Sequence, residues 1–248
     1  MIRLTDVHKS FGSNQVLRGA TLDVAKGTST VVIGGSGTGK SVLLKCILGL
    51  VTPDAGTIHV DGVDVTTQPR DAFLARFGML FQGGALFDSI PVWQNVAFRL
   101  MRGSLKRPKV EARDIAIEKL RRVGLAPDVA DRLPAELSGG MQKRVSLARA
   151  IAANPEIIFF DEPTTGLDPI MSGVINDLIR EIVTEMGATA ITITHDMTSV
   201  RAIADRVAML HGGSIRWEGP IAEMDSAADP YVDQFIHGRP TGPIETLR

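Results

Sequence analysis

The chain has 248 residues, of which 44% are apolar and 22% charged, and its formal net charge is −1 at pH 7. This is the composition of an ordinary globular protein, long enough for one large domain or two lobes that share a core. The near-neutral charge gives no reason to expect nucleic acid or an anionic membrane surface as the main partner, although local charged patches are compatible with it.

The single cysteine, Cys46, excludes an intrachain disulfide and fits a reducing compartment. It lies in the apolar run VLLKCILGL (42–50), which predicts a core position rather than a reactive thiol. The first ten residues lack the apolar core of a signal peptide, and no stretch approaches the roughly 20 apolar residues of a membrane span. We therefore expect a cytoplasmic protein that reaches a membrane only through a partner chain.

The first quarter of the chain alternates short apolar segments with turn signals. Three segments predict antiparallel strands, namely IRLTDVHKSF (2–11), ATLDVAKG (20–27) and GTIHVDGVDV (56–65). Asp61-Gly62 predicts a hairpin turn. Between these segments, STVVIGG (29–35) is a continuous apolar strand that leads through glycines into a helix, GKSVLLKCILGL (39–50).

The glycine-rich stretch GGSGTGKS (34–41) satisfies the pattern G-x-x-x-x-G-K-[ST], and it lies between a strand and a helix as that pattern requires. Glycines let backbone N–H groups curl around phosphates, Lys40 would reach the β and γ oxygens, and Ser41 would hold Mg²⁺ through Oγ. The predicted nucleoside triphosphate site comprises Gly34, Gly35, Ser36, Gly37, Thr38, Gly39, Lys40 and Ser41.

From about residue 84 to residue 153 the sequence predicts one helix after another. Pro91 opens PVWQNVAFRLM (91–101), and VEARDIAIEKLRRVGL (110–125) has a single apolar face. Strands and helices alternate again afterwards, with a helix at 169–186. A parallel sheet interrupted by an all-helical insert is the simplest architecture for this order.

The stretch ELSGGMQKRVSLARA (136–150) begins the last helix of this insert in an unusual way. Ser138, Gly139 and Gly140 place a hydroxyl and bare backbone N–H groups at the positive end of the helix. A helix end of this kind is suited to an anion. It is a second such end, separate from the phosphate loop.

Polar side chains follow three apolar strands. Asp161 and Glu162 follow EIIFF (156–160). Asp161 would hold the metal, and Glu162 would orient and deprotonate an attacking water. The alternative is that these acids only end the strand. His195 follows TAITIT (189–194), where open α/β sheets place ligands, unless it only caps the next helix. Gln82 follows GMLF (78–81). A lone Gln at a strand end is usually a turn residue, so Gln82 is a candidate site residue only because Asp161, Glu162 and His195 occur in the same chain.

These motifs, in this order, resemble the nucleotide-binding subunits of ATP-binding cassette (ABC) transporters. The resemblance rests on the phosphate loop, Gln82, LSGG (137–140), FFDEP (159–163), GLDP (166–169) and ITHD (193–196), and it spans nearly the whole chain. It implies an α/β fold: a P-loop NTPase (RecA-like) core with an antiparallel β subdomain and an inserted all-helical subdomain. The ATP-binding domain would cover 1–219, with the helical insert at about 84–153.

The resemblance also assigns roles. Phe11 would stack on adenine, Gln82 would contact Mg²⁺ and the attacking water, and His195 would contact the γ-phosphate. In this family two cassettes dimerise head to tail, so Ser138, Gly139 and Gly140 would contact ATP held by the other copy. Asp168 would belong to the loop that links the two sites.

Three positions depart from the commonest family pattern. Met141 stands where Gln is usual, Phe11 where Tyr is frequent, and Gly35 where Pro is frequent. None of these changes removes a catalytic group. Met141 does put in doubt any contact that a Gln side chain would make there.

Within the family, three stretches resemble the ATPases of Mla-type systems, which move phospholipid between membranes. They are LFQGGALFDSIPVWQNVAF (80–98), LSGGM (137–141) and YVDQFIHGRPTGPI (231–244). The implied partners are a second copy, a membrane permease dimer, an MCE-type periplasmic substrate-binding protein and, in some systems, a small STAS-like cytoplasmic subunit. The chain would then lie on the inner face of the cytoplasmic membrane.

Two other functions stay open. One is a transporter ATPase for another cargo, such as an amino acid, an organic solvent or a steroid. The other is a cassette ATPase that transports nothing, but the chain has one phosphate loop and one signature, and no sustained heptads lie between Lys40 and Ser138. Cargo and transport direction cannot be read from these residues.

The segment 220–248 is predicted as an appendage to the main domain. Asp229 and Pro230 are placed to begin a short helix with an apolar stripe, and RPTGPIETLR (239–248) has no periodicity. The helix either docks on its own lobe with a disordered end behind it, or continues as an extended arm across the second copy.

Overall fold

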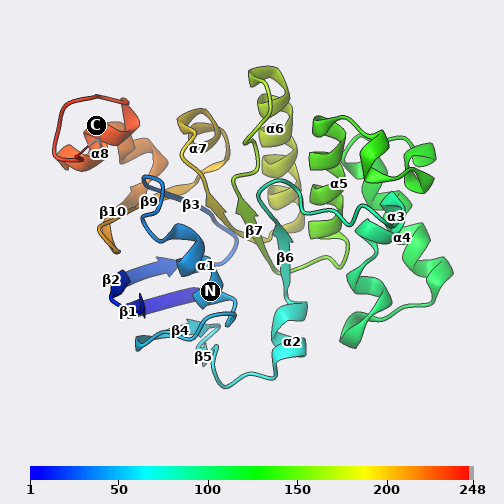
Figure 1. The fold of residues 1–248 in the computed structure, drawn as a ribbon, viewed down its shortest axis with the longest axis horizontal. Helices are drawn as coiled ribbons and strands as arrows, with labels where there is room; N and C mark the ends of the chain where they lie inside the picture. Colours follow the sequence, from blue (N-terminus) through cyan, green and yellow to red (C-terminus); the bar gives the residue numbers. More distant parts are fainter. Residues whose placement is uncertain (246–248) are drawn as a thin grey trace. The chain divides into compact units, whose positions relative to one another are not determined.

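The structure is a computed structural model that describes residues 1–245. Its contacts divide the chain into two compact units, and Figure 1 labels most of their helices and strands. Unit 1 joins Met1–Thr67 to the chain from Ile193 onward, and unit 2 comprises Gln68–Thr192. Among the described residues, no helix combines the length and the apolar character that a membrane crossing demands.

Unit 1 contains an antiparallel sheet with strand order β2-β1-β4-β5. Its strands are β1 (Ile2–Phe11), β2 (Asn14–Val24), β4 (Ala55–Val60) and β5 (Val63–Asp64). Ile2 and Leu4 are fully buried and alternate with exposed residues, as expected of a sheet with one covered face. Positive φ at both Asp61 (51°) and Gly62 (79°) confirms the predicted hairpin turn.

A second group of strands in unit 1 has the order β10-β9-β3. β3 (Ser29–Ile33) pairs in parallel with β9 (Arg206–His211), which pairs antiparallel with β10 (Ser214–Pro220). The helices of this unit are α1 (Lys40–Ile47), α7 (Met197–Ile203), η5 (Ile221–Ser226) and α8 (Pro230–Ile236). Cys46 is buried in α1, and burial raises the pKa of its thiol to about 11, which confirms the predicted core position.

Unit 2 has a group of strands in the order β8-β7-β6. They are β6 (Phe77–Leu80), β7 (Ile157–Asp161) and β8 (Thr189–Ile193). β6 and β7 run parallel, and the rings of Phe77 and Phe159 stack between them with centroids 5.5 Å apart. The first four residues of β7 are completely buried. The apolar strands predicted before Asp161 and before His195 are therefore confirmed.

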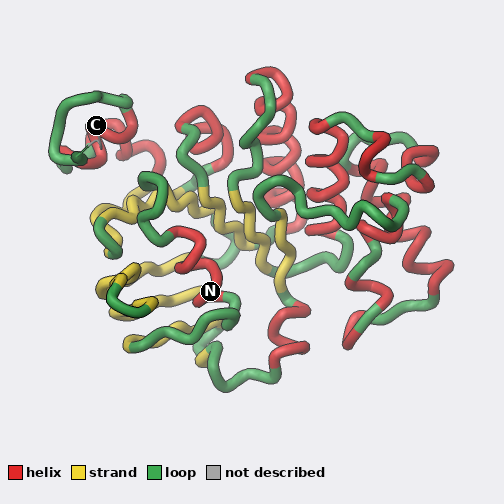
Figure 2. The backbone as a smooth tube through the Cα atoms, in the orientation of Figure 1, coloured by secondary structure: helices red, strands yellow, loops and turns green. Residues whose placement is uncertain are grey.

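A run of helices follows β6, drawn in red in Figure 2. They are α3 (Val92–Val96), η1 (Arg99–Met101), η2 (Gly103–Leu105), α4 (Lys109–Arg122), η3 (Pro127–Asp131), η4 (Pro134–Glu136) and α5 (Gly139–Ile151). Two more helices of unit 2 are α2 (Arg70–Ala75), before β6, and α6 (Pro169–Met186), after β7. α4 buries Ala112, Ala116 and Leu120 on one face, and α6 has the predicted bounds.

The helix that opens after Pro91 is shorter than its sequence predicts. α3 ends at Val96, and the chain continues as the turn η1. In η1, the Arg99 guanidinium donates to the carbonyl oxygens of Phe77 and Leu74. These tertiary contacts bind the turn to β6 and α2, and they prevail over local helix propensity.

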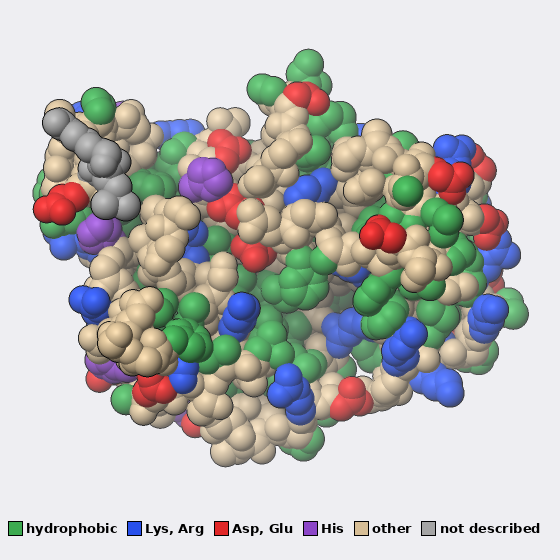
Figure 3. All heavy atoms as spheres, viewed as in Figure 1, with side chains coloured by type: hydrophobic (Ala, Val, Ile, Leu, Met, Phe, Trp, Pro, Cys, Tyr) green, Lys and Arg blue, Asp and Glu red, His purple; other side chains and the backbone are tan. Residues whose placement is uncertain are grey.

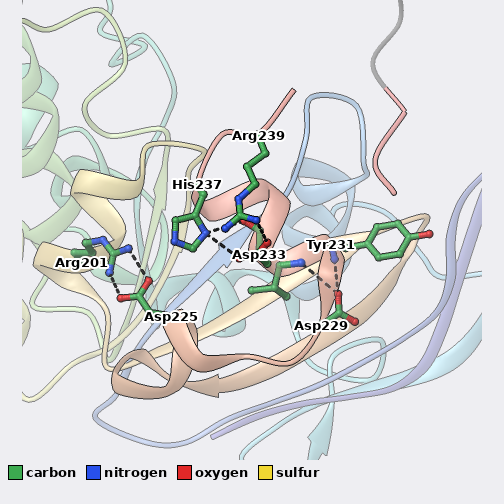
Figure 4. Close-up of polar contacts among 8 residues, drawn as sticks. Arg201, Asp225, Asp229, Tyr231, Asp233, His237 and Arg239 are labelled. Atoms are coloured by element: carbon green, nitrogen blue, oxygen red, sulfur yellow. Dashed lines mark hydrogen bonds and ion pairs between the residues drawn. The ribbon is translucent and has the colours of Figure 1, made fainter. Parts of the chain in front are cut away.

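α8 begins as predicted and docks on its own unit. Asp229 caps it by accepting a hydrogen bond from the backbone N–H of Tyr231 (2.8 Å), as Figure 4 shows. The Tyr231 ring contacts two other side chains: its centroid is 3.8 Å from the guanidinium carbon of Arg216 and 4.7 Å from the ring centroid of His211. Because Arg216 and His211 belong to β10 and β9, these contacts fix α8 on that sheet.

The residues after α8 turn back towards it. The buried Gln234 side chain accepts a hydrogen bond from the N–H of Ile244 (2.7 Å) and donates to the carbonyl oxygens of Ile244 (3.1 Å) and Arg239 (3.3 Å). The chain from 239 to 244 is thus held against its own helix. The last three residues of the predicted arm, 246–248, lie outside the described residues.

Candidate functional site

The phosphate loop of unit 1 lies between β3 and α1 and depends on its glycines. A Cβ on Gly34 (φ 153°) would fall on the carbonyl oxygen of Leu210, so no larger residue fits there. Gly37 (φ 76°) and Gly39 (φ 102°) also adopt conformations that favour glycine. The all-buried strand β3 delivers the chain to this loop in a fixed position.

The Lys40 side chain is buried and folds over the same loop. Its Nζ donates to the carbonyl oxygens of Gly34 (2.7 Å) and Gly35 (2.8 Å). α1 begins at Lys40, and the residue before it, Gly39, has no side chain to cap the first N–H groups. An ammonium group and the N-terminal N–H groups of a helix are therefore brought together, which is the donor set that binds phosphate.

The other expected site residues of unit 1 are accessible. Phe11 ends β1 opposite Asn14, and 50% of its surface is exposed. Ser41 is exposed in the first turn of α1. His195 is exposed directly after β8. A flat ring, a hydroxyl and an imidazole are thus each exposed to solvent.

The structure also decides whether His195 caps the next helix. The cap of α7 is Asp196, whose carboxylate accepts hydrogen bonds from Thr198 N (3.0 Å), Ser199 N (3.3 Å) and Ser199 Oγ (2.7 Å). Partial burial raises the pKa of Asp196, but these hydrogen bonds outweigh it and leave the pKa below its ordinary value. Because Asp196 is the N-cap of α7, the alternative that His195 only caps this helix is wrong.

In unit 2, β7 places two acids at its end. Asp161 is the last residue of β7 and is half-buried, whereas Glu162 is only 8% exposed. Thr165 Oγ1 donates to Glu162 Oε2 (3.1 Å). Glu162 has a φ of 48°, which is unusual for a residue with a Cβ. Backbone strain of this kind is common at functional positions.

Lys143, on α5, lies behind these acids and was not expected from the sequence. Its side chain is buried, and its Nζ donates to the backbone oxygen of Glu162 (3.4 Å). Burial lowers the pKa of Lys143, although attraction to Glu162 and Asp161 opposes that change. A signal was available: Lys143 precedes the buried Leu147 and Ala150 by four and seven residues, so it falls on the inward face of the helix.

The start of α5 has the predicted geometry. Ser138 is the N-cap, and its Oγ accepts a hydrogen bond from Met141 N (3.3 Å). Gly139 is exposed, with open space where a Cβ would be, whereas a Cβ on Gly140 would lie 2.6 Å from Met171 Cε. Since Met171 is in the first turn of α6, the small residue at 140 allows this close packing. Asp168 caps α6 by accepting from Met171 N (3.0 Å).

Gln82 is exposed in a turn that α5 holds in place. Ser146 Oγ donates to the carbonyl oxygen of Gly84 (3.1 Å), and Arg149 donates to those of Gly84 (2.6 Å) and Ala85 (2.7 Å). Burial lowers the pKa of Arg149, but a guanidinium stays charged at neutral pH. Two polar side chains of α5 thereby fix the backbone next to Gln82.

A third polar side chain secures the same segment from α3. Asn95 is completely buried; its Oδ1 accepts from Phe87 N (2.7 Å), and its Nδ2 donates to the oxygens of Phe87 (3.1 Å) and Ile90 (3.1 Å). Sequence reasoning missed Asn95, Ser146 and Arg149. An asparagine between apolar residues of a helix is the available signal, because a buried amide must find partners.

The expected residues therefore divide between the units. Unit 1 holds Phe11, the loop 34–41 and His195, while unit 2 holds Gln82, Asp161, Glu162 and the start of α5. Within unit 2, α5 joins three of the predicted motifs: the SGG end, the backbone of Glu162 and the segment after Gln82.

Comparisons with known proteins assign this set of features to a family. A family profile described as ABC transporter matches residues 17–165. The chain is 41% identical over 246 residues to the probable ribonucleotide transport ATP-binding protein mkl of Mycobacterium leprae, a match that covers 98% of this chain and 70% of the relative. The chain belongs to the ABC transporter family. The chain is a nucleotide-binding cassette of this family, and it hydrolyses ATP in a reaction coupled to transport.

Two further relatives bear on cargo. Protein TRIGALACTOSYLDIACYLGLYCEROL 3, chloroplastic, of Arabidopsis thaliana is 39% identical over 262 residues, covering 98% of this chain and 75% of the relative. The methionine import ATP-binding protein MetN of Brucella abortus is 40% identical over 224 residues, covering 89% of this chain and 60% of the relative.

A solved structure confirms the fold. The dimeric, post-hydrolysis structure of an ATP-binding cassette bound to ADP and Pi matches with a TM-score of 0.79 and 31% identity, and it covers 89% of this chain and 99% of that one. The predicted α/β P-loop NTPase fold is therefore confirmed.

Proposed function

We propose that this chain powers phospholipid transport between membranes, as the ATPase of an MCE- or Mla-type ABC transporter. The observation that carries the proposal is the extent of similarity to the plant relative named for trigalactosyldiacylglycerol, a lipid. That similarity covers 98% of this chain, against 89% for the methionine importer. The relative mkl, whose name refers to ribonucleotides, covers the chain equally well, so the lipid cargo needs a direct test.

The proposed catalytic roles follow from chemistry at the two units. Lys40 and the N–H groups of the loop 34–41 bind the phosphates, and Phe11 stacks on the adenine. Glu162 orients the attacking water and accepts its proton, while Gln82 and His195 contact the water and the γ-phosphate. The half-exposed Phe11 ring and the nearly buried carboxylate of Glu162 suit these roles.

The residues proposed to hold Mg²⁺ are Ser41, Gln82 and Asp161. A hydroxyl, an amide and a carboxylate supply only oxygen ligands, which a small, hard cation such as Mg²⁺ prefers. Among residues 1–245 no group of three or more His, Cys, Asp or Glu side chains is placed to enclose a metal ion. A site that shares its ion with substrate phosphates needs no such enclosure. When bound, Mg²⁺ neutralises charge on the phosphates.

We further propose that two copies assemble head to tail, with Ser138, Gly139 and Gly140 of one copy contacting the γ-phosphate held by the other. The start of α5 supports this assembly, because Ser138 and Gly139 are exposed in the single chain. The matching cassette structure is itself dimeric. Hydrolysis would remove the shared contact and allow the two copies to separate.

The proposed partners place the chain on the inner face of the cytoplasmic membrane. They are a permease dimer, an MCE-type periplasmic protein and, in some systems, a small STAS-like subunit. Alternative cargoes are an amino acid, supported by the MetN relative, or an organic solvent or steroid.

Cargo is tested by isolating the complex from native membranes through a tag on this chain. The expected result is copurification of an integral membrane permease and an MCE-domain protein, with phospholipid enriched over bulk membrane lipid. Recovery of a periplasmic amino acid-binding protein, with no enrichment of lipid, would contradict the lipid assignment and favour import of a small solute.

A further inference from the structure

A run of cations in unit 2 has few carboxylates beside it: within residues 1–245 its one ion pair joins Arg107 to Glu111, at 3.8 Å. We call the exposed segment from Arg102 to Val110, between η1 and the start of α4, the basic turn. From residue 99 to residue 109 the sequence has five cations and no Asp or Glu, in a chain whose net charge is −1. Lys and Arg side chains gather over η2 and the start of α4 in Figure 3.

Each cation of the basic turn can be followed individually. The Arg102 guanidinium carbon lies 3.8 Å from the centroid of the Phe98 ring, on which it stacks. Arg107 Nε is 3.8 Å from Glu111 Oε1, which is beyond hydrogen-bond distance. Lys109 Nζ is 5.8 Å from the Trp93 ring. Lys106 has no ion pair among residues 1–245.

Several other surface arginines of the chain are paired at close range. Examples are Arg3 with Asp23, Arg113 with Asp131, Arg132 with Asp128, Arg201 with Asp225, and Arg216 with Asp229, all at 2.7–3.0 Å. The basic turn differs in two ways: the ion pair between Arg107 and Glu111 is longer, at 3.8 Å, and Asp71 accepts from the backbone N–H of Ser104 (2.9 Å) rather than from a cation of the turn. Most of the charge of the turn is therefore available to an anion outside the chain.

The turn presents these charges from a fixed backbone. Asp71 holds Ser104, and Arg107 N donates to the carbonyl oxygen of Leu100 (2.7 Å). Val110 stands beside Lys109 with 75% of its surface exposed, so an apolar side chain projects among the cations. Cations that surround an exposed apolar residue suit a membrane interface, where phosphates meet acyl chains.

We propose that the basic turn docks on the anionic phospholipid headgroups of the membrane that carries the permease. The proposal rests on the proposed function for the presence of that membrane. Nucleic acid fits less well, because the chain has no net positive charge, Trp93 is 5% exposed, and the nearer Phe98 ring already stacks with Arg102 and Phe87. The docking would orient unit 2 beside the permease through headgroup phosphates and Lys or Arg side chains.

Binding of the full-length chain to vesicles tests the proposal. Sedimentation with phosphatidylcholine vesicles is compared with sedimentation with vesicles that also contain phosphatidylglycerol. The variant is Lys106→Gln combined with Lys109→Gln, and its control is Lys26→Gln combined with Arg121→Gln, which removes the same charge from exposed positions elsewhere. Each lysine at a membrane surface changes the partition constant about fivefold, so the double variant should bind roughly 10- to 30-fold more weakly.

The expected result is binding to anionic vesicles only, weaker at high salt, weakened by that factor in the variant and unchanged in the control. Equal binding to neutral vesicles, or equal losses in variant and control, would overturn the proposal. Unchanged vesicle binding together with reduced association with the permease in detergent would assign the turn to an acidic protein segment instead. A chain that binds vesicles but recovers no permease from native membranes would contradict the proposed function and leave the lipid contact standing.

Discussion

Glu162 combines a strained backbone with a nearly buried carboxylate. Its φ of 48° and its hydrogen bond from Thr165 hold the side chain in one orientation at the end of β7. If Glu162 is the base, Glu162→Gln keeps the shape but removes the basic oxygen. ATP binding should persist, while the rate of hydrolysis falls about 10²- to 10⁴-fold.

The ATPase rate and the affinity for ATP are both measured for the variant and the unmodified chain. Glu181→Gln, at an exposed position of α6, is the control. The variant should also accumulate an ATP-bound dimer, visible by size-exclusion chromatography. Turnover close to that of the unmodified chain would remove Glu162 from the role of base.

Lys143 is a positioning residue in this scheme, because its contact is with the backbone of Glu162 and not with substrate. Lys143→Met keeps most of the volume and removes the ammonium. Loss of one hydrogen bond of about 1–1.5 kcal/mol predicts a fall in kcat of about tenfold with little change in KM. The free energy of unfolding should not fall, since the substitution also removes a desolvated cation that has no ion pair within residues 1–245.

Steady-state kinetics and thermal unfolding separate these effects, with Lys26→Met as the control. Lys143→Arg should recover part of kcat because it restores a donor. A parallel drop in kcat and in the melting temperature would show that Lys143 only supports packing.

At the scale of elements, the apolar residues of the segment after Gln82 fall into two sets. Val92, Trp93 and Val96 are buried in α3, whereas Phe87 is 43% exposed and stacks on Phe98 with ring centroids 4.4 Å apart. Asn95 fixes the backbone of Phe87 from beneath. The first three side chains therefore form core, and Phe87 is left for a partner.

We expect Phe87 to contact a cytoplasmic helix of the permease. Phe87→Ala should weaken association with the permease more than it lowers the melting temperature, since the lost ring stacking is worth only about 0.5–1.5 kcal/mol. Copurification in detergent measures the first quantity and calorimetry the second. Leu133→Ala, at an exposed apolar position elsewhere, is the control. Comparable losses in both measurements would assign Phe87 to the core as well.

Elements with strong local signals could be predicted from the sequence. The phosphate loop, β7, the capped start of α5 and the bounds of α6 all follow from glycines, apolar runs and capping residues. The end of α3 could not be predicted, because it depends on Arg99 reaching carbonyl groups more than twenty residues earlier. The roles of Ser146 and Arg149 depend in the same way on carbonyls about sixty residues away. Local patterns carry no information about such pairs.

At the scale of the whole molecule, the head-to-tail dimer predicts complementation between two inactive chains. Ser138→Arg places bulk and charge where the partner's γ-phosphate should lie but leaves its own phosphate loop intact. Lys40→Ala removes a direct phosphate contact and should weaken ATP binding itself. Mixing the two should restore one competent site per heterodimer at most, measured as regained ATPase activity. Absence of ATP binding by Ser138→Arg alone would show that Ser138 acts within its own chain or that the variant is misfolded.

The C-terminal segment gives a second prediction at this scale. Deleting residues 238–248 removes the backbone groups that satisfy the buried amide of Gln234, so stability should fall by about 1–3 kcal/mol. If the segment serves only its own unit, specific activity should not depend on protein concentration. Steep loss of activity on dilution, with ATP binding unchanged, would show instead that the segment bridges two copies. Gln234→Leu, which removes the amide, is the matched variant.

α5 carries its contacts at fixed angular positions: Ser138 at its cap, then Lys143, Ser146 and Arg149 along its length. One inserted residue would rotate everything beyond it by about 100°. An insertion after Met141 would therefore break three contacts at once. The hydrogen bonds of Ser146 and Arg149 to the segment after Gln82 would be lost, as would that of Lys143 to Glu162, while the cap at Ser138 would remain. We therefore expect α5 to tolerate substitutions at its other positions but not an insertion or deletion. Its length between the cap and Arg149 is accordingly expected to be among the least variable distances as this protein diverges.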